Sequence, residues 1–196
     1  MTRLPDLLTE HDLPIAELHA ARLDGLVQSI GGDFRAADRP EVLADRVRAI
    51  ASQVPHRMIV CEESAAWIWG AIGRAPQPLR LCSPPRHRAR LIPSALVVAR
   101  ELRLQPHETV ELTAPGPLPR VITVTTALRT AVDLARAAAR PLASTALHAM
   151  IIDGLVRPDD VRAALDLDRR RPGRIAAIAA VERAEHDGRL RDQPSS

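Results

Sequence analysis

The 196 residues carry 27 basic and 24 acidic side chains, a net charge of +3, and 46% of them are hydrophobic, which is enough for one or two domains with a buried core. Every basic residue is an arginine, and without lysine the chain cannot form a Walker-A phosphate loop, a Schiff base or a lysine-dependent nuclease site. The G-x-S-x-G elbow of many hydrolases is missing as well, so we expect no enzymatic activity.

Histidine and cysteine give no sign of a metal or cofactor site. The seven histidines lack metal-ligand spacing, and Cys61 and Cys82 form no C-x-x-C pair. Two cysteines this far apart in sequence suit a reduced compartment. No apolar run approaches the roughly 20 residues that span a bilayer, and the first eight residues lack the apolar segment of a signal peptide. We therefore predict a cytoplasmic protein with no membrane partner.

Charge is distributed unevenly along the chain. Residues 1–40 hold four arginines and seven acids, a net charge of −3, so the remainder carries +6. Two segments concentrate the positive charge, and they contain Arg80, Arg86, Arg88 and Arg90, and Arg169, Arg170, Arg171 and Arg174. Such segments either attract phosphates or form an ordinary solvated surface.

The first 40 residues are expected to contain two short helices and a hairpin. Leu4, Leu7 and Leu8 have helical spacing, and a second helix is expected from Pro14 until Gly25 stops it. Short apolar segments on both sides of Gly31-Gly32 indicate two strands and a tight turn. This order is the outline of a winged helix-turn-helix.

The rest of the chain mixes strands and helices. Helices are expected at 40–52 and around Trp67 and Trp69, followed by strands at 96–104, 109–112 and 120–124. Further helices are expected from about residues 126, 141 and 158, and after Pro172-Gly173. The fold class is therefore α+β, with a winged-helix-like domain at 1–40, a mixed domain with a small β-sheet and C-terminal helices at 41–190, and a disordered tail at 191–196.

Several segments, taken in order, resemble the AbiEi-type antitoxin family of type IV toxin–antitoxin systems. They are 13–32 with its helix and Gly-Gly wing, Glu63-Ser64-Ala65-Ala66-Trp67-Ile68-Trp69-Gly70, Leu81-Cys82-Ser83-Pro84, the Arg-Thr-x-x-Asp-Leu-Ala core within 125–136, and Asp153-Gly154-Leu155-Val156. The resemblance spans nearly the whole chain. It implies a winged helix that binds operator DNA, and a C-terminal domain that counters a nucleotidyltransferase-like toxin. Some relatives continue into a Vsr-like nuclease domain, which we do not expect in this chain.

Two groups of residues are candidates for DNA binding. His19, Arg22 and Arg35 would contact the DNA backbone and groove from the helix and wing, although acids match bases there and the segment can equally be a winged helix that is kept only for its fold. Arg86, Arg88 and Arg90 alternate in a loop and would contact phosphates, or else belong to a solvated loop.

Arg129, Thr130 and Asp133 form the centre of the fourth segment that carries the resemblance. Arg129 and Asp133 are four residues apart on an expected helix, where side chains of opposite charge pair. A catalytic acid would need a second carboxylate or a metal ligand nearby, and the sequence indicates neither. We therefore assign the motif a structural role.

The sequence thus predicts an antitoxin-like transcriptional regulator whose partners are operator DNA, a toxin protein, or both. The alternative is a stand-alone protein-interaction module that no longer binds DNA. The negative charge of residues 1–40 favours the alternative, and the order of the domains favours the regulator.

Overall fold

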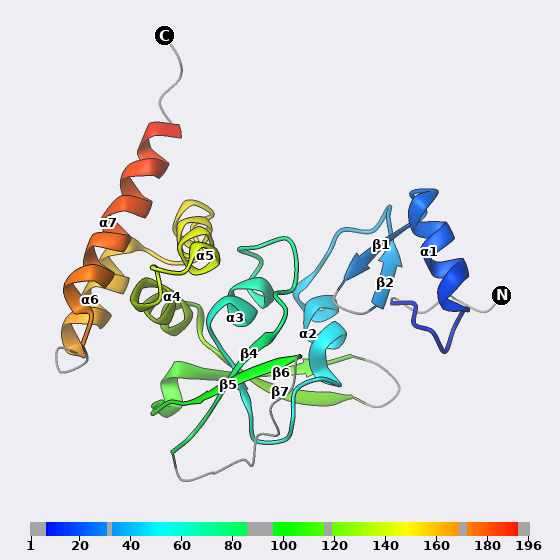
Figure 1. Cartoon of the computed structure of the whole chain (residues 1–196), viewed down its shortest axis with the longest axis horizontal. Helices are drawn as coiled ribbons and strands as arrows, with labels where there is room; N and C mark the ends of the chain where they lie inside the picture. The colour runs from blue at the N-terminus through cyan, green and yellow to red at the C-terminus, as the bar shows by residue number, and fades with distance from the viewer. Residues whose placement is uncertain (1–6, 31–32, 86–95, 116–118, 169–171, 192–196) are drawn as a thin grey trace. The chain divides into compact units, whose positions relative to one another are not determined.

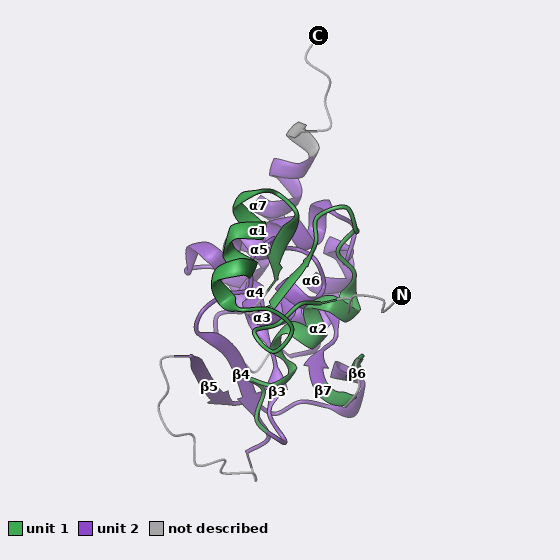
Figure 2. Cartoon of the chain, turned by 90° about the vertical axis from the view of Figure 1, so that its right-hand side faces the viewer, with its two compact units in different colours: residues 1–55, 112–122 green, residues 56–111, 123–196 purple. Residues whose placement is uncertain are grey.

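The computed structural model describes residues 7–30, 33–85, 96–115, 119–168 and 172–191. Within these residues the protein is a mixed α/β structure with seven α-helices, a two-stranded sheet and a five-stranded sheet (Figure 1). The chain divides into two compact units, coloured separately in Figure 2. The first consists of residues 1–55 and 112–122, and the second of residues 56–111 and 123–196. The predicted domain 1–40 therefore lies within the first unit.

The first unit is built on a helix and a hairpin. Helix α1 (Ile15–Leu23) begins after Pro14 and ends before Gly25, whose φ of +74° is a left-handed conformation that glycine adopts readily. Strands β1 (Val27–Ile30) and β2 (Asp33–Ala36) pair antiparallel on both sides of Gly31-Gly32, as predicted. Leu8, Leu18, Val27 and Phe34 pack together as the core of this region.

One predicted element of this unit is wrong. We expected a helix around Leu4–Leu8, but the described residues Leu7 and Leu8 are not helical. Leu8 instead forms an isolated antiparallel bridge to Phe34, with backbone hydrogen bonds of 2.6 and 2.9 Å. Pairing with a strand 26 residues away fixes Leu8 in an extended conformation, which overrides the local helical spacing. Helix α2 (Leu43–Ala51) follows the hairpin and buries Val47 and Ile50.

The second unit contains most of the five-stranded sheet. Its strands are β3 (Ile59–Val60), β4 (Leu79–Ser83), β5 (Val97–Glu101), β6 (Thr109–Ala114) and β7 (Arg120–Thr125), in the order β5-β4-β3-β7-β6. The short central strand β3 pairs antiparallel with β4 and parallel with β7. Strand β4 lies between the expected helix around Trp67 and Trp69 and the expected strand at 96–104, and was not predicted.

Helices cover this sheet and form the larger core. Helix α3 (Glu62–Ile68) follows β3 directly, and the 3-10 helix η1 (Pro106–Glu108) precedes β6. Helices α4 (Ala127–Arg136), α5 (Pro141–Ile152), α6 (Pro158–Leu167) and α7 (Arg174–Arg191) pack on one another (Figure 1). Their buried side chains include Leu134, Leu147, Met150, Leu165 and Val181. The predicted tail after Arg191 lies outside the described residues.

Candidate functional site

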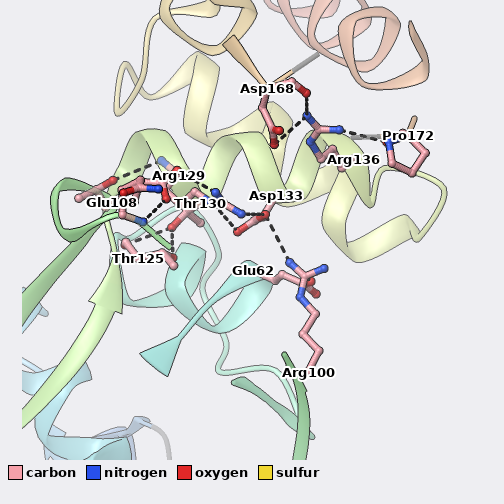
Figure 3. Close-up of polar contacts among 12 residues, drawn as sticks. Glu62, Arg100, Glu108, Thr125, Arg129, Thr130, Asp133, Arg136, Asp168 and Pro172 are labelled. Carbon is pink, nitrogen blue, oxygen red and sulfur yellow. Dashed lines mark hydrogen bonds and ion pairs between the residues drawn. The ribbon is translucent and has the colours of Figure 1, made fainter. Parts of the chain in front are cut away.

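The Arg-Thr-x-x-Asp motif lies at the start of α4, where the helix leaves β7. The hydroxyl of Thr126 accepts a hydrogen bond from the backbone N–H of Arg129 at 3.3 Å and caps the helix. One turn separates Arg129 from Asp133, so the two side chains meet on the same face of α4. The guanidinium donates from Nε to Oδ2 at 3.0 Å and from Nη2 to Oδ1 at 2.8 Å (Figure 3). Both side chains are buried, with exposed fractions of 6% and 2%.

Arg129 also forms an ion pair with a second carboxylate. Glu108, at the end of η1, accepts a hydrogen bond from Nη1 at 2.8 Å. Burial disfavours the charged guanidinium, but the hydrogen bonds and charges of Asp133 and Glu108 outweigh burial and raise the pKa of Arg129. Burial alone would raise the pKa of Glu108, yet hydrogen bonds from the backbone of Gln105 and from Arg129 lower it. Arg129 and Glu108 are therefore both ionised at neutral pH.

Thr130 ties the motif to the sheet. Its hydroxyl and that of Thr125, the last residue of β7, are 2.7 Å apart, and it also lies 3.2 Å from the Thr125 carbonyl oxygen. The indole Nε1 of Trp69 donates to the same carbonyl at 2.9 Å. These contacts join α4 to β7 and to the residues after α3, and they support the structural role that we assigned to the motif.

Further charges surround Asp133. Arg100 of β5 places Nη2 at 3.3 Å from Asp133 Oδ1 and at 2.8 Å from Oε1 of Glu62 (Figure 3). Arg140 reaches Glu62 Oε2 at 2.5 Å and Glu63 Oε1 at 3.2 Å. The buried carboxylates of Glu62 and Glu63 thus hold arginines that come from separate elements.

Charge is balanced within this network. Arg80 also belongs to the network, because its Nε lies 3.7 Å from Glu63 Oε2. The network thus pairs four arginines with four carboxylates: Arg80, Arg100, Arg129 and Arg140 with Glu62, Glu63, Glu108 and Asp133. Because the charges compensate one another, the network needs no bound ion to remain stable in the interior. Among the described residues, no group of three His, Cys, Asp or Glu side chains is arranged to hold a metal ion.

One member of the network is conformationally strained. Glu62 has φ +51°, a left-handed conformation that costs a non-glycine residue about 1–3 kcal/mol. The carboxylate of the same residue forms the ion pairs with Arg100 and Arg140. The next residue, Glu63, has an Oε2 atom with no hydrogen-bond partner among the described residues.

A pocket of about 970 Å³ lies beside the motif. Its polar side includes Arg103, His107 and Glu108, and its apolar side includes Leu128 and Leu167. Leu128 and Leu167 are 39% and 91% exposed, so the apolar side is open to solvent.

The two cysteines, far apart in sequence, lie close together near the paired strands β3 and β4. Cys82 of β4 is opposite Ile59 of β3, and Cys61 is the residue after β3. Both thiols are free and buried. A hydrogen bond with Cys82 and burial raise the pKa of Cys61 well above its ordinary value, so Cys61 offers no thiolate nucleophile at neutral pH.

The DNA-binding candidates of the first unit have different environments. Arg22 is exposed on α1, and His19 is exposed and contacts Phe34 edge-on, with ring centroids 5.4 Å apart. Arg35 is only 7% exposed, and its guanidinium donates to the side chain of Gln28 and to the backbone carbonyl of Arg39. These contacts favour a structural role for Arg35 over the predicted contact with DNA. Arg86, Arg88 and Arg90 lie outside the described residues.

No family model and no curated protein matches this chain. Among solved structures, the RV2827C protein from Mycobacterium tuberculosis is similar, with 14% sequence identity and a TM-score of 0.38. The match covers 98% of this chain and 78% of the other.

Sequence reasoning found the centre of the charge network and missed its surroundings. Arg129 and Asp133 have helical spacing, but Glu108 is 21 residues before Arg129, and Glu62 is 78 residues before its partner Arg140. The one local signal is the pair Glu62-Glu63 at the start of the expected helix around Trp67 and Trp69. Two adjacent acids directly after a buried strand are the pattern that could have indicated buried ion pairs.

Proposed function

We propose that this chain is an antitoxin-like transcriptional regulator of a type IV toxin–antitoxin system, which binds operator DNA, neutralises a nucleotidyltransferase-like toxin, or does both. It works in the cytoplasm, by contact, with no catalysis and no cofactor. The observation that carries the proposal is the first unit, in which α1 is followed by the antiparallel hairpin β1–β2. The bridge from Leu8 to Phe34 adds a third extended segment to this hairpin. A helix followed by such a hairpin supports a winged-helix reader of DNA.

In this proposal Arg22 and the arginines of segment 86–90 have different roles, because the net charge around them differs. Residues 1–40 carry a net charge of −3, so α1 contributes little attraction to phosphates. Arg22 of α1 reads base edges, while Arg86, Arg88 and Arg90 supply the attraction to the backbone. Three phosphate contacts give a slope of about −2.7 in a plot of log affinity against log salt concentration.

Fluorescence anisotropy with the DNA upstream of the protein's own gene, at several salt concentrations, tests this function. Changing Arg86, Arg88 and Arg90 together to Ala should weaken binding more than Arg22→Ala, and should flatten the salt dependence by up to about 2.7 units. Arg22→Ala should instead reduce the difference in affinity between DNA sequences that differ at one or two base pairs of the site. If the wild type does not bind this DNA at about 50 mM salt, where phosphate attraction is strong, the DNA-binding part of the proposal fails.

The toxin part is tested with the product of the adjacent gene. A nucleotidyltransferase-like neighbour that co-purifies with this chain, and whose toxicity disappears on co-expression, supports neutralisation by contact. A neighbour of another class, or a toxin that stays active with the chain in excess, contradicts it.

A second candidate is a protein-interaction module that no longer binds DNA. The exposed surface of α1 favours it, because Ile15 and Leu23 are 49% and 80% exposed on a helix that would face DNA. A helix that reads DNA usually presents arginine and amide side chains to phosphates and base edges. Binding to a protein partner without any affinity for the upstream DNA would select this candidate.

A further inference from the structure

The pocket beside the Arg-Thr-x-x-Asp motif is built by the second unit alone, because every residue that lines it belongs to that unit. Its volume of about 970 Å³ lies within the range of about 300–1,000 Å³ that is usual for small-molecule sites. Helices α4 and α6 form one wall, and the segment 101–108, which joins β5 to β6, forms another.

The wall from the helices is apolar. Leu128 and Val132 are one turn apart on α4, and Ala164 and Leu167 are three residues apart on α6. Val132 is 5% exposed and Leu167 is 91% exposed, so this wall extends from the interior to the surface. Apolar side chains of this kind supply most of the contact area in small-molecule sites.

The other wall is polar because of the alternation of an extended chain. Leu102 and Leu104 pack into an apolar cluster with residues of β3 and β4. Side chains alternate between the two sides of an extended segment. Their neighbours Glu101, Arg103 and Gln105 therefore lie on the other side, where they line the pocket.

The charges of the lining residues compensate one another. Glu108 pairs with Arg129 at 2.8 Å, and Asp168 pairs with Arg136 at 3.4 Å (Figure 3). With histidine counted as neutral, the charged lining residues left over are one acid and one base, Glu101 and Arg103. A charged ligand would lose its hydration in this pocket without meeting an excess of opposite charge, whereas an uncharged ligand would not.

Arg129 brings hydrogen-bond donors to the pocket that the described part of the chain leaves unused. A guanidinium has five N–H groups. Two of them donate to Asp133 and one donates to Glu108, so one N–H on Nη1 and one on Nη2 have no acceptor among the described residues. The Arg129 side chain is only 6% exposed, and a buried donor without an acceptor is unfavourable. An oxygen acceptor on a ligand would satisfy these donors.

We infer that this pocket binds an uncharged small molecule that has an apolar body and a carbonyl oxygen. The carbonyl oxygen accepts from Arg129, and the apolar body lies against Leu128 and Val132. The inference goes beyond the proposed function, because neither DNA binding nor toxin neutralisation by contact requires a small molecule.

Three naphthalene probes test the inference by fluorescence titration of the full chain. Prodan is uncharged and carries a propionyl carbonyl, and its emission moves to shorter wavelength when it leaves water. Dimethylaminonaphthalene is the same ring without the carbonyl, and should bind about tenfold more weakly because it accepts no hydrogen bond from the guanidinium. Anilinonaphthalene sulfonate is an anion and should also bind more weakly than Prodan. Equal binding of the first two probes, or tighter binding of the sulfonate, would overturn the inference.

A pair of leucine variants locates the site. Leu128→Ala should weaken Prodan binding about fivefold, because it removes apolar surface from the pocket wall. Leu142→Ala is the matched control: Leu142 is the second residue of α5 as Leu128 is of α4, the two are 45% and 39% exposed, and Leu142 does not line the pocket. This control should bind Prodan as the wild type does. An equal loss in both variants, or no loss in Leu128→Ala, would place the probe elsewhere and refute the site.

A further variant tests the donor. Arg129→Met combined with Asp133→Leu removes the guanidinium together with its partner charge, so that no buried charge is left unpaired. If circular dichroism shows that this variant is folded, it should bind Prodan and dimethylaminonaphthalene equally well. A preference for Prodan that persists in the folded variant would exclude Arg129 as the donor and overturn the inference. If the variant does not fold, the probe comparison on the wild type and the two leucine variants still decide. None of these outcomes depends on whether the chain binds DNA.

Discussion

Asp133→Ala removes the carboxylate that accepts two of the three hydrogen bonds of the buried Arg129 side chain. The remaining partner is Glu108, at 2.8 Å. Breaking a buried ion pair on one side costs about 3–5 kcal/mol, because the other charge stays in the interior. Since Glu108 still pairs with the guanidinium, we expect a loss of about 3 kcal/mol, at the lower end of this range.

Urea unfolding followed by tryptophan fluorescence measures this loss in the second unit alone. Both tryptophans of the chain, Trp67 and Trp69, belong to that unit, and Trp69 donates to the carbonyl of Thr125 next to the motif. In thermal unfolding the same change should lower Tm by on the order of 6–12 °C, at about 2–4 °C per kcal/mol for a chain of this size. Asp159→Ala is the control, because Asp159 is 77% exposed and its pair with Arg162 contributes less than about 1 kcal/mol.

A second variant tests whether the loss comes from an unpaired charge. Arg129→Met combined with Asp133→Leu removes both charges and keeps apolar volume, and should recover most of the stability that Asp133→Ala loses. If Asp133→Ala and Arg129→Ala both stay within about 0.5 kcal/mol of the wild type, the size of an ordinary surface effect, the structural reading is refuted. Loss of partner binding in those stable variants would make the motif an interface.

Other properties give further predictions. The pKa of Glu108 is lowered in the folded chain, so the stability that its ionised carboxylate contributes should be constant above its ordinary pKa of 4.5 and fall as the pH drops below it. The urea midpoints of the wild type and of Glu108→Gln should therefore converge in acid. A difference that stays constant with pH would contradict this. Arg35→Ala removes the donor to the exposed Gln28 side chain and to the Arg39 carbonyl, and should destabilise the first unit by about 1 kcal/mol through the lost hydrogen bonds, whereas exposed Arg22→Ala should change stability by less than about 0.5 kcal/mol in the same chemical denaturation, monitored by circular dichroism. The purified protein should not turn over nucleotides or nucleic acid, and activity abolished by a point change in this chain would show that it is an enzyme.

Elements with a local cause were predictable from the sequence. Pro141 and Pro158 begin α5 and α6, since proline at the first helical position loses no hydrogen bond and has the right φ. Gly25 ends α1 because the chain there requires a positive φ. The β1–β2 hairpin follows from a Gly-Gly pair between two apolar segments.

Elements that form because they pair with residues far away in the sequence were not predictable. Leu8 has helical spacing but pairs with Phe34 across 26 residues of chain. Strand β4 contains Arg80 and follows Pro78, so its composition resembles a loop, and pairing with both β3 and β5 makes it a strand. In the candidate site, spacing predicts the contact between Arg129 and Asp133. The adjacent acids Glu62-Glu63 indicate buried ion pairs, but no local pattern predicts which arginines Glu62 and Glu108 contact.

The first unit contains residues 112–122 from the middle of the chain as well as residues 1–55. Arg120 in that inserted stretch donates from Nη2 to the carbonyl of Val54 at 2.7 Å. A single cut after residue 55 therefore cannot release the whole first unit, because the fragment 1–55 loses this hydrogen bond and the residues around it. Loss of DNA or partner binding in such a fragment would report incomplete folding as readily as a missing second unit. Point substitutions in the full chain, unlike truncations, can assign a function to one unit.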